Sequence, residues 1–269
     1  MLGRLPLRPR AVDAGLPLAG GPFRPWGIRW VGLELARDDL LYDLAPMLPL
    51  WDANPNRRAP VMTVLIITAN LAVFVGEVWL MLTKQMDPFI RHYALVPRQL
   101  FTHWADGAQW LTLFTHMFLH GGVAHVLGNC WFLWIFGKNV EDRLGPLQFL
   151  IFYLLSGLAA AALQVIVDPG SSVPMLGASG AISGVLGAYL LLFPTAWIIT
   201  LVPWIVPILP VPAFIFLVLW FVIQAFNGVG SPLESGSSGG VAWWAHAGGF
   251  LAGMGLLSLA KHAGLVRRR

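Results

Sequence analysis

A few polar side chains stand in stretches of this chain that are otherwise apolar. Ser179 lies in "GASGAISG", His246 lies in "WWAHAGG", and His125 precedes Asn129 in "HVLGN". Serine becomes an effective nucleophile when a neighbouring imidazole takes its proton. Ser179 and His246 are therefore candidates for a nucleophile and its general base, and the chemistry they predict is acyl transfer.

The position of Ser179 also suits an oxyanion. The serine stands where a helix is expected to begin, and a helix start offers unpaired N–H groups and the positive end of the helix dipole. Gly177 and Gly180 provide the backbone freedom that such a turn needs. His125 and Asn129 are four residues apart and share one helix face, so both can donate hydrogen bonds to the same oxyanion.

Two other features limit the chemistry. No Asp or Glu lies at the level of these groups in the second to sixth apolar stretches, so the sequence predicts a Ser–His dyad without a carboxylate. His116, His120 and His125 raise the alternative of a zinc or haem site, but "HMFLH" lacks the glutamate of the H-E-x-x-H metalloprotease motif. We expect no metal and no cofactor.

The elements that hold these residues are expected to be membrane helices. Of 269 residues, 57% are hydrophobic and 11% are charged, whereas about 25% of a soluble domain is charged. A span needs about 20 apolar residues. Six ranges qualify as apolar spans, although the fourth is short: 61–82, 123–137, 147–167, 180–193, 205–226 and 241–260. The predicted fold is all-α, with six transmembrane helices.

Basic residues near the span ends set the expected orientation, because cytoplasmic loops carry the excess of Lys and Arg. Most of them fall on one side: Arg57, Arg58, Lys138, Arg143, Lys261 and Arg267 to Arg269. We expect both termini to be cytoplasmic, in a bacterial cell (inner) membrane. Residues 1–59 are expected to form a partly disordered cytoplasmic extension, and residues 60–265 the six-helix domain. Within the extension, "ELARDDLLYDLAPMLPLW" predicts a short amphipathic surface helix.

The helical rise places the polar groups at similar depth below the outer boundary. From a rise of about 1.5 Å per residue and a core of about 30 Å, Ser179 lies roughly 9 Å deep, His246 roughly 8 Å and His125 roughly 10 Å. Small residues at four-residue spacing let helices approach closely. Gly180 and Gly184 provide them in the fourth span, and Gly249 and Gly253 in the sixth, on the face that carries His246.

Together with these residues, several motifs resemble those of rhomboid intramembrane serine proteases. They are "PLWDANPNRRAPVMT", "HMFLHGGVAHVLGN", "EDRLG", "GASGAISG" and "AHAGGFLAG", and the resemblance covers residues 47–264. It implies a six-helix rhomboid bundle with Ser179 as nucleophile and His246 as general base. It also implies that His125, Asn129 and the backbone N–H groups of Ser179 and Ala178 stabilise the oxyanion.

The resemblance further implies a membrane-embedded first loop and a water-filled cavity open to the outside. Its substrates would be single-span membrane proteins, cut in or near the membrane segment; the lipid bilayer is the other partner, and no nucleic acid is expected. Some family members carry an aromatic residue that stacks on the catalytic histidine at the position of Ser183, so what positions His246 is an open question. The alternative function is a catalytically inactive rhomboid-like protein that binds transmembrane helices.

Overall fold

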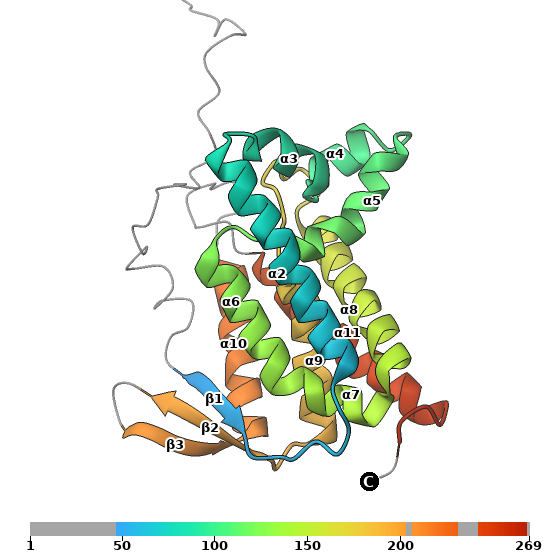
Figure 1. The fold of residues 1–269 in the computed structure, drawn as a ribbon. Coiled ribbons are helices and arrows are strands. Elements are labelled where there is room, and N and C mark those ends of the chain that lie inside the picture. Colours follow the sequence, from blue (N-terminus) through green and yellow to red (C-terminus); the bar gives the residue numbers. More distant parts are fainter. Residues whose placement is uncertain (1–46, 203–205, 231–241, 268–269) are drawn as a thin grey trace, which may run out of the picture.

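A computed structural model describes residues 47–202, 206–230 and 242–267. Helices lie over the six ranges predicted as spans, and they run side by side (Figure 1). They are α2 (Val61–Leu82), α6 (Val123–Phe132), α8 (Pro146–Val167), α9 (Ser179–Leu192), α10 (Ala213–Gly230) and α11 (Trp243–His262). Of the described helices, α2 and α8 are long and apolar enough to cross a membrane by themselves. Helix α9 is shorter, and its residues Gly180 to Tyr189 are all buried.

The connections between these helices occupy the two ends of the bundle (Figure 1). At one end, the long first loop forms α3 (Met86–Tyr93), α4 (Pro97–Thr102), α5 (Gly107–Thr115) and the 3₁₀ turn η1 (His116–Phe118). Toward the other end, α6 continues through a π-helical turn, η2 (Leu133–Gly137), into α7 (Lys138–Leu144). The candidate site residues lie toward the end that carries the first loop.

A three-stranded antiparallel sheet corrects the expectation that the fold is all-α. Its strands are β1 (Leu48–Asp52), β2 (Trp197–Val202) and β3 (Val206–Pro212), in the order β1-β2-β3, at the end of the bundle opposite the first loop (Figure 1). Ile198 pairs with both Asp52 and Val211. The inward face of β2 is buried and includes Ile198 and Thr200.

The sheet changes three sequence expectations. The fifth span was predicted from residue 205, but the helix begins at Ala213, because the prolines at 207, 210 and 212 have no N–H to donate within a helix. The last residues of the predicted surface helix lie in β1 as extended chain, while residues 34–46 of that prediction lie outside the described residues. Since β1 pairs with β2, the folded unit begins upstream of the predicted boundary at residue 60.

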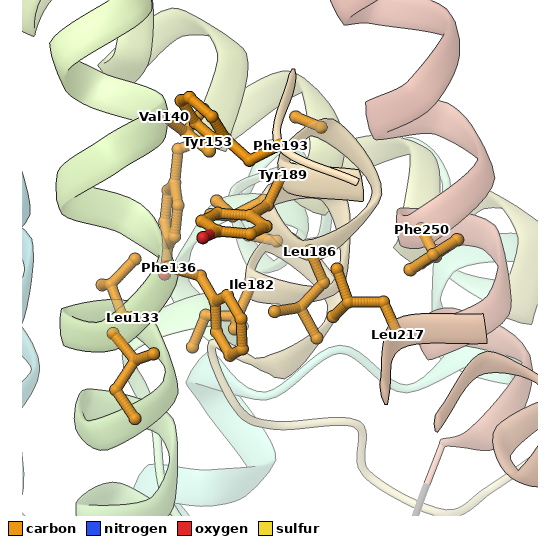
Figure 2. Close-up of a cluster of buried hydrophobic side chains, with 14 of the residues drawn as sticks. Leu133, Phe136, Val140, Tyr153, Ile182, Leu186, Tyr189, Phe193, Leu217 and Phe250 are labelled. Atoms are coloured by element: carbon orange, nitrogen blue, oxygen red, sulfur yellow. The ribbon is translucent and has the colours of Figure 1, made fainter. Parts of the chain in front are cut away.

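The main hydrophobic core lies where η2, α8, α9 and α10 meet (Figure 2). Phe136 contacts the ring of Tyr189 edge-on at 5.1 Å between centroids and the ring of Phe216 at 6.1 Å. Such aromatic pairs add about 0.5–1.5 kcal/mol to the stabilisation from area burial. Leu133, Phe136 and Tyr189 are completely buried, so this core fixes α9 relative to its neighbours.

Two buried carboxylates anchor the chain near the sheet. Glu141 of α7 accepts hydrogen bonds from Met62 N (2.8 Å), Thr63 N (2.7 Å) and Thr63 Oγ1 (2.7 Å), and it thereby satisfies the first N–H groups of α2. Asp52 of β1 accepts from Asn54 N at 2.7 Å and from Asn139 Nδ2. Burial is the dominant influence on Asp52 and raises the pKa of its carboxyl group.

Candidate active site

Helix α9 begins at Ser179 because the preceding chain makes a sharp turn. Gly177 has a φ of +125°, a conformation that favours glycine. Its N–H donates to His116 O at 2.8 Å. Two residues earlier, Met175 pairs with Leu95 of the first loop through reciprocal backbone hydrogen bonds of 2.7 and 3.1 Å. The first loop and η1 therefore hold the turn that presents Ser179.

Ser179 and His246 lie within hydrogen-bonding distance of each other. The distance from His246 Nε2 to Ser179 Oγ is 2.7 Å, and both residues are half-buried. His246 stands in the first turn of α11, where Gln164 of α8 accepts a hydrogen bond from Ala245 N at 3.2 Å. The structure thus brings together, across 67 positions of the chain, the two residues that the sequence predicts as nucleophile and base.

Four glycines allow this approach. A Cβ added at Gly249 would lie 2.0 Å from Gly180 O, and one at Gly253 would lie 2.0 Å from Gly184 O. The neighbouring atoms are backbone and cannot rotate away. Helices α9 and α11 therefore touch backbone to backbone, as the small residues at four-residue spacing predicted.

A third polar side chain completes the surroundings of His246, and sequence reasoning missed it. Gln224 of α10 places Oε1 2.8 Å from His246 Nδ1, and it is buried with 6% of its surface exposed. The sequence carried a signal for it. Gln224 is the one side chain with an amide, hydroxyl or charge in "AFIFLVLWFVIQAF", and a polar group in a span is usually functional. An amide oxygen can accept a hydrogen bond from an imidazole N–H as a carboxylate does, so the absence of Asp and Glu at this level does not leave His246 without a partner.

Two aromatic rings flank His246. Trp220 of α10 lies 6.2 Å from the imidazole between centroids, in a tilted arrangement, and Trp243 lies edge-on at 6.1 Å. Ser183 is turned elsewhere, because its hydroxyl donates to Ser179 O at 2.7 Å. The aromatic contacts of His246 therefore come from α10 and α11 and not from the position of Ser183.

Of the two predicted oxyanion side chains of α6, His125 lies against the turn before Ser179. A Cβ at Gly177 would lie 2.8 Å from His125 Nε2 and 3.5 Å from Ser179 Oγ, so the absence of a Cβ lets the His125 ring pack against Gly177, close to Ser179. Asn129 is buried, and its Nδ2 has no hydrogen-bond partner within the described part of the chain. The Ala178 side chain is fully buried at the start of α9. A buried donor without an acceptor is costly, and a bound oxygen would satisfy it.

His116 and His120 make hydrogen bonds that do not involve Ser179 or His246. His116 Nδ1 lies 2.8 Å from Thr112 O, and His120 N donates to both oxygens of buried Glu77 at 3.1 and 3.2 Å. The bond of His116 lies between α5 and η1, and the two bonds from His120 N tie the chain after η1 to α2. Over residues 47–202, 206–230 and 242–267, no group of three or more His, Cys, Asp or Glu has the arrangement of a metal site.

Comparison with known proteins identifies the family of this chain. A family model described as the rhomboid domain matches residues 107–261, which include Ser179, His246 and Gln224. The chain belongs to the rhomboid family. Rhomboid proteins are integral membrane proteins, which fits the composition and the apolar helices of this chain.

Several curated rhomboid proteins are similar to this chain. Rhomboid protease GluP of Bacillus subtilis is 40% identical over 82 residues, which are 30% of this chain and 16% of that protein. Rhomboid protein 1 of Saccharomyces cerevisiae mitochondria is 27% identical over 218 residues, 80% of this chain and 56% of that protein. The bovine presenilin-associated rhomboid-like protein is 28% identical over 70% of this chain and 46% of its own length. The matched regions thus span 16–56% of these relatives.

Proposed function

We propose that this rhomboid protein is an intramembrane serine endopeptidase that cleaves single-span membrane proteins in or near their membrane segment. The observation that carries the proposal is the 2.7 Å contact between Ser179 Oγ and His246 Nε2 at the start of α9. The name of one relative, rhomboid protease GluP, supports the same reaction class.

The reaction proceeds in two acyl-transfer steps. Ser179 Oγ attacks the substrate carbonyl carbon while its proton moves to His246 Nε2, and the carbonyl π electrons become an oxyanion. The oxyanion collapses, the C–N bond breaks, and His246 returns the proton to the departing amine. Water then attacks the ester, gives a proton to His246, and releases the carboxyl product as Ser179 Oγ recovers its proton.

The oxyanion is stabilised by groups that surround Ser179. Asn129 Nδ2 is a buried donor that lacks an acceptor among the described residues, and His125 Nε2 packs against Gly177, two residues before Ser179. The N–H groups of Ser179 and Ala178 belong to the start of α9, where the helix dipole favours negative charge. Loss of one such donor typically slows catalysis about 10²- to 10³-fold.

The proposed setting is a bundle of six spans in a bacterial inner membrane, with both termini in the cytoplasm. In that orientation the first loop lies at the outer side, and the substrate segment and water reach Ser179 from there. The sheet and the Glu141 anchor then lie at the cytoplasmic end. Residues 1–46, which precede the described part of the chain, belong to the cytoplasmic extension in this orientation.

Cleavage by reconstituted protein tests the proposal. The full chain is placed in liposomes with a single-span peptide that carries a fluorophore and a quencher on either side of an alanine in its outer third. We expect cleavage by the wild type and loss of at least about 10³-fold with Ser179→Ala and with His246→Ala. Ser258→Ala is the matched control, because that hydroxyl bonds to Met254 O of its own helix.

The control variant should cleave at the wild-type rate. Equal cleavage by the wild type and Ser179→Ala would rule out the serine mechanism. Binding of the peptide without cleavage by the wild type would favour the alternative function, an inactive rhomboid-like protein that binds transmembrane helices.

A further inference from the structure

The imidazole of His246 has two ring nitrogens, and each faces one polar side chain. Nε2 lies 2.7 Å from Ser179 Oγ, and Nδ1 lies 2.8 Å from Gln224 Oε1. An amide oxygen accepts hydrogen bonds and cannot donate them. Gln224 therefore requires a proton on Nδ1, which leaves Nε2 of the neutral ring as the acceptor for the hydroxyl proton of Ser179.

We propose that Gln224 is a positioning residue of the catalytic unit, so that Ser179, His246 and Gln224 act together as a triad with an amide in the third place. The inference rests on the proposed function. Gln224 holds the imidazole in the tautomer and orientation that general-base catalysis requires. When Nε2 takes the serine proton, the Nδ1–H bond becomes a bond from a charged ring, and such bonds are stronger than neutral ones.

The surroundings of Gln224 suit this task. Gln224 and Trp220 stand one turn apart on the face of α10 that also carries buried Leu217. Val222 and Phe226, on the other side of the helix, are 51% and 77% exposed. The inward face of α10 thus places Gln224 Oε1 2.8 Å from His246 Nδ1 and the Trp220 ring 6.2 Å from the imidazole between centroids. The amide is neutral, so the site keeps the acceptor without burying a carboxylate charge.

The position of Gln224 on α10 has a consequence for activity. Ser179 and His246 belong to α9 and α11, which are joined backbone to backbone by their glycines. Gln224 comes from a third helix, and its contact with His246 is a single hydrogen bond between side chains. A displacement of α10 therefore removes the acceptor from Nδ1 while the Ser179–His246 pair stays together. The wild-type position of α10 is a condition for the correct tautomer.

Two substitutions at one position separate positioning from packing. Gln224→Met keeps the length and shape of the side chain and removes the acceptor, whereas Gln224→Glu keeps an acceptor oxygen. Val222→Met is the control for methionine on α10, because that side chain faces away from the bundle. The full chain in liposomes is assayed with the fluorophore–quencher peptide for kcat and KM. The rate at which a fluorophosphonate labels Ser179 is measured in parallel.

We expect Gln224→Met to lower kcat and the labelling rate about 10- to 100-fold, the factor that corresponds to one hydrogen bond to a charged group. KM should stay within about twofold, and Gln224→Glu should recover most of the lost rate. Wild-type kcat in Gln224→Met would overturn the inference. Equal losses in Gln224→Met and Val222→Met would also overturn it, because a methionine on α10 would then explain them. If Ser179→Ala cleaves the peptide, the proposed function itself fails, which is a distinct result.

Discussion

The contact between α9 and α11 makes a quantitative prediction about Gly249. A Cβ at this position would lie 2.0 Å from Gly180 O, whereas ordinary contacts begin at 3.4 Å. The alanine variant must therefore separate the two backbones locally by up to about 1.4 Å, because no flexible side chain can move aside. Gly180 follows Ser179, and His246 stands one turn before Gly249.

Such a shift lengthens the 2.7 Å contact of Ser179 Oγ with His246 Nε2 beyond hydrogen-bonding distance. A misplacement of about 1 Å can cost about 100-fold in rate, and overpacking a tight interface costs about 1–3 kcal/mol of stability. We therefore expect Gly249→Ala to lower kcat by about 100-fold and to reduce the free energy of unfolding by about 1–3 kcal/mol.

The assay compares peptide cleavage and thermal unfolding of the full-length variants in the same detergent. Gly255→Ala is the matched control, since it lies on the same helix and a Cβ there meets nothing within 4 Å. It should keep full activity and gain up to about 1 kcal/mol from helix propensity. Wild-type activity and stability in Gly249→Ala, or an equal loss in Gly255→Ala, would show that the close contact of α9 with α11 does not set the position of His246.

Three further predictions concern the end of the bundle that carries the sheet. Glu141→Ala leaves the first N–H groups of α2 without their acceptor and should lower the free energy of unfolding by about 2 kcal/mol, measured by denaturation in detergent; an unchanged value would contradict the anchoring. Because burial raises the pKa of Asp52, its stabilising effect is complete below about pH 4 and is lost as pH rises through the folded pKa. Asp52→Asn, which stays neutral, should therefore flatten the dependence of Tm on pH over that range, and an unaltered slope would contradict this. Trp131→Phe removes the 2.7 Å bond from its Nε1 to Pro49 O and should lower the free energy of unfolding by about 1 kcal/mol in the same denaturation assay. An unchanged value would show that other contacts hold β1.

Much of the candidate site could be predicted because its residues are rare in their surroundings. A serine or histidine in an apolar stretch is conspicuous, and a fixed rise per residue converts its position into a depth. That reasoning placed Ser179, His246 and His125 at one level, and the structure has Ser179 and His246 in contact. The small residues of α9 and α11 indicated in advance which helices approach each other.

The sheet and the side chains around His246 could not be predicted from the sequence in this way. Hydropathy does not separate an apolar strand from an apolar helix, and "VPILPVP" reads as membrane span until its prolines are considered. One partner of β2 is β1, which lies about 150 positions upstream, so no local sequence pattern predicts this pairing. Trp220 and Gln224 act on His246 because α10 turns this face toward α11, and the rotation of a helix depends on the packing of the whole bundle.

In the proposed mechanism, Ser179 is a nucleophile that His246 activates. Its most direct test is the reaction of the reconstituted full chain with a fluorophosphonate, followed by mass spectrometry of the modified peptide. We expect a single adduct on Ser179 in the wild type, none with Ser179→Ala, and labelling slowed by at least about 100-fold with His246→Ala. An adduct on another residue, or labelling of Ser179 at the wild-type rate in His246→Ala, would contradict it.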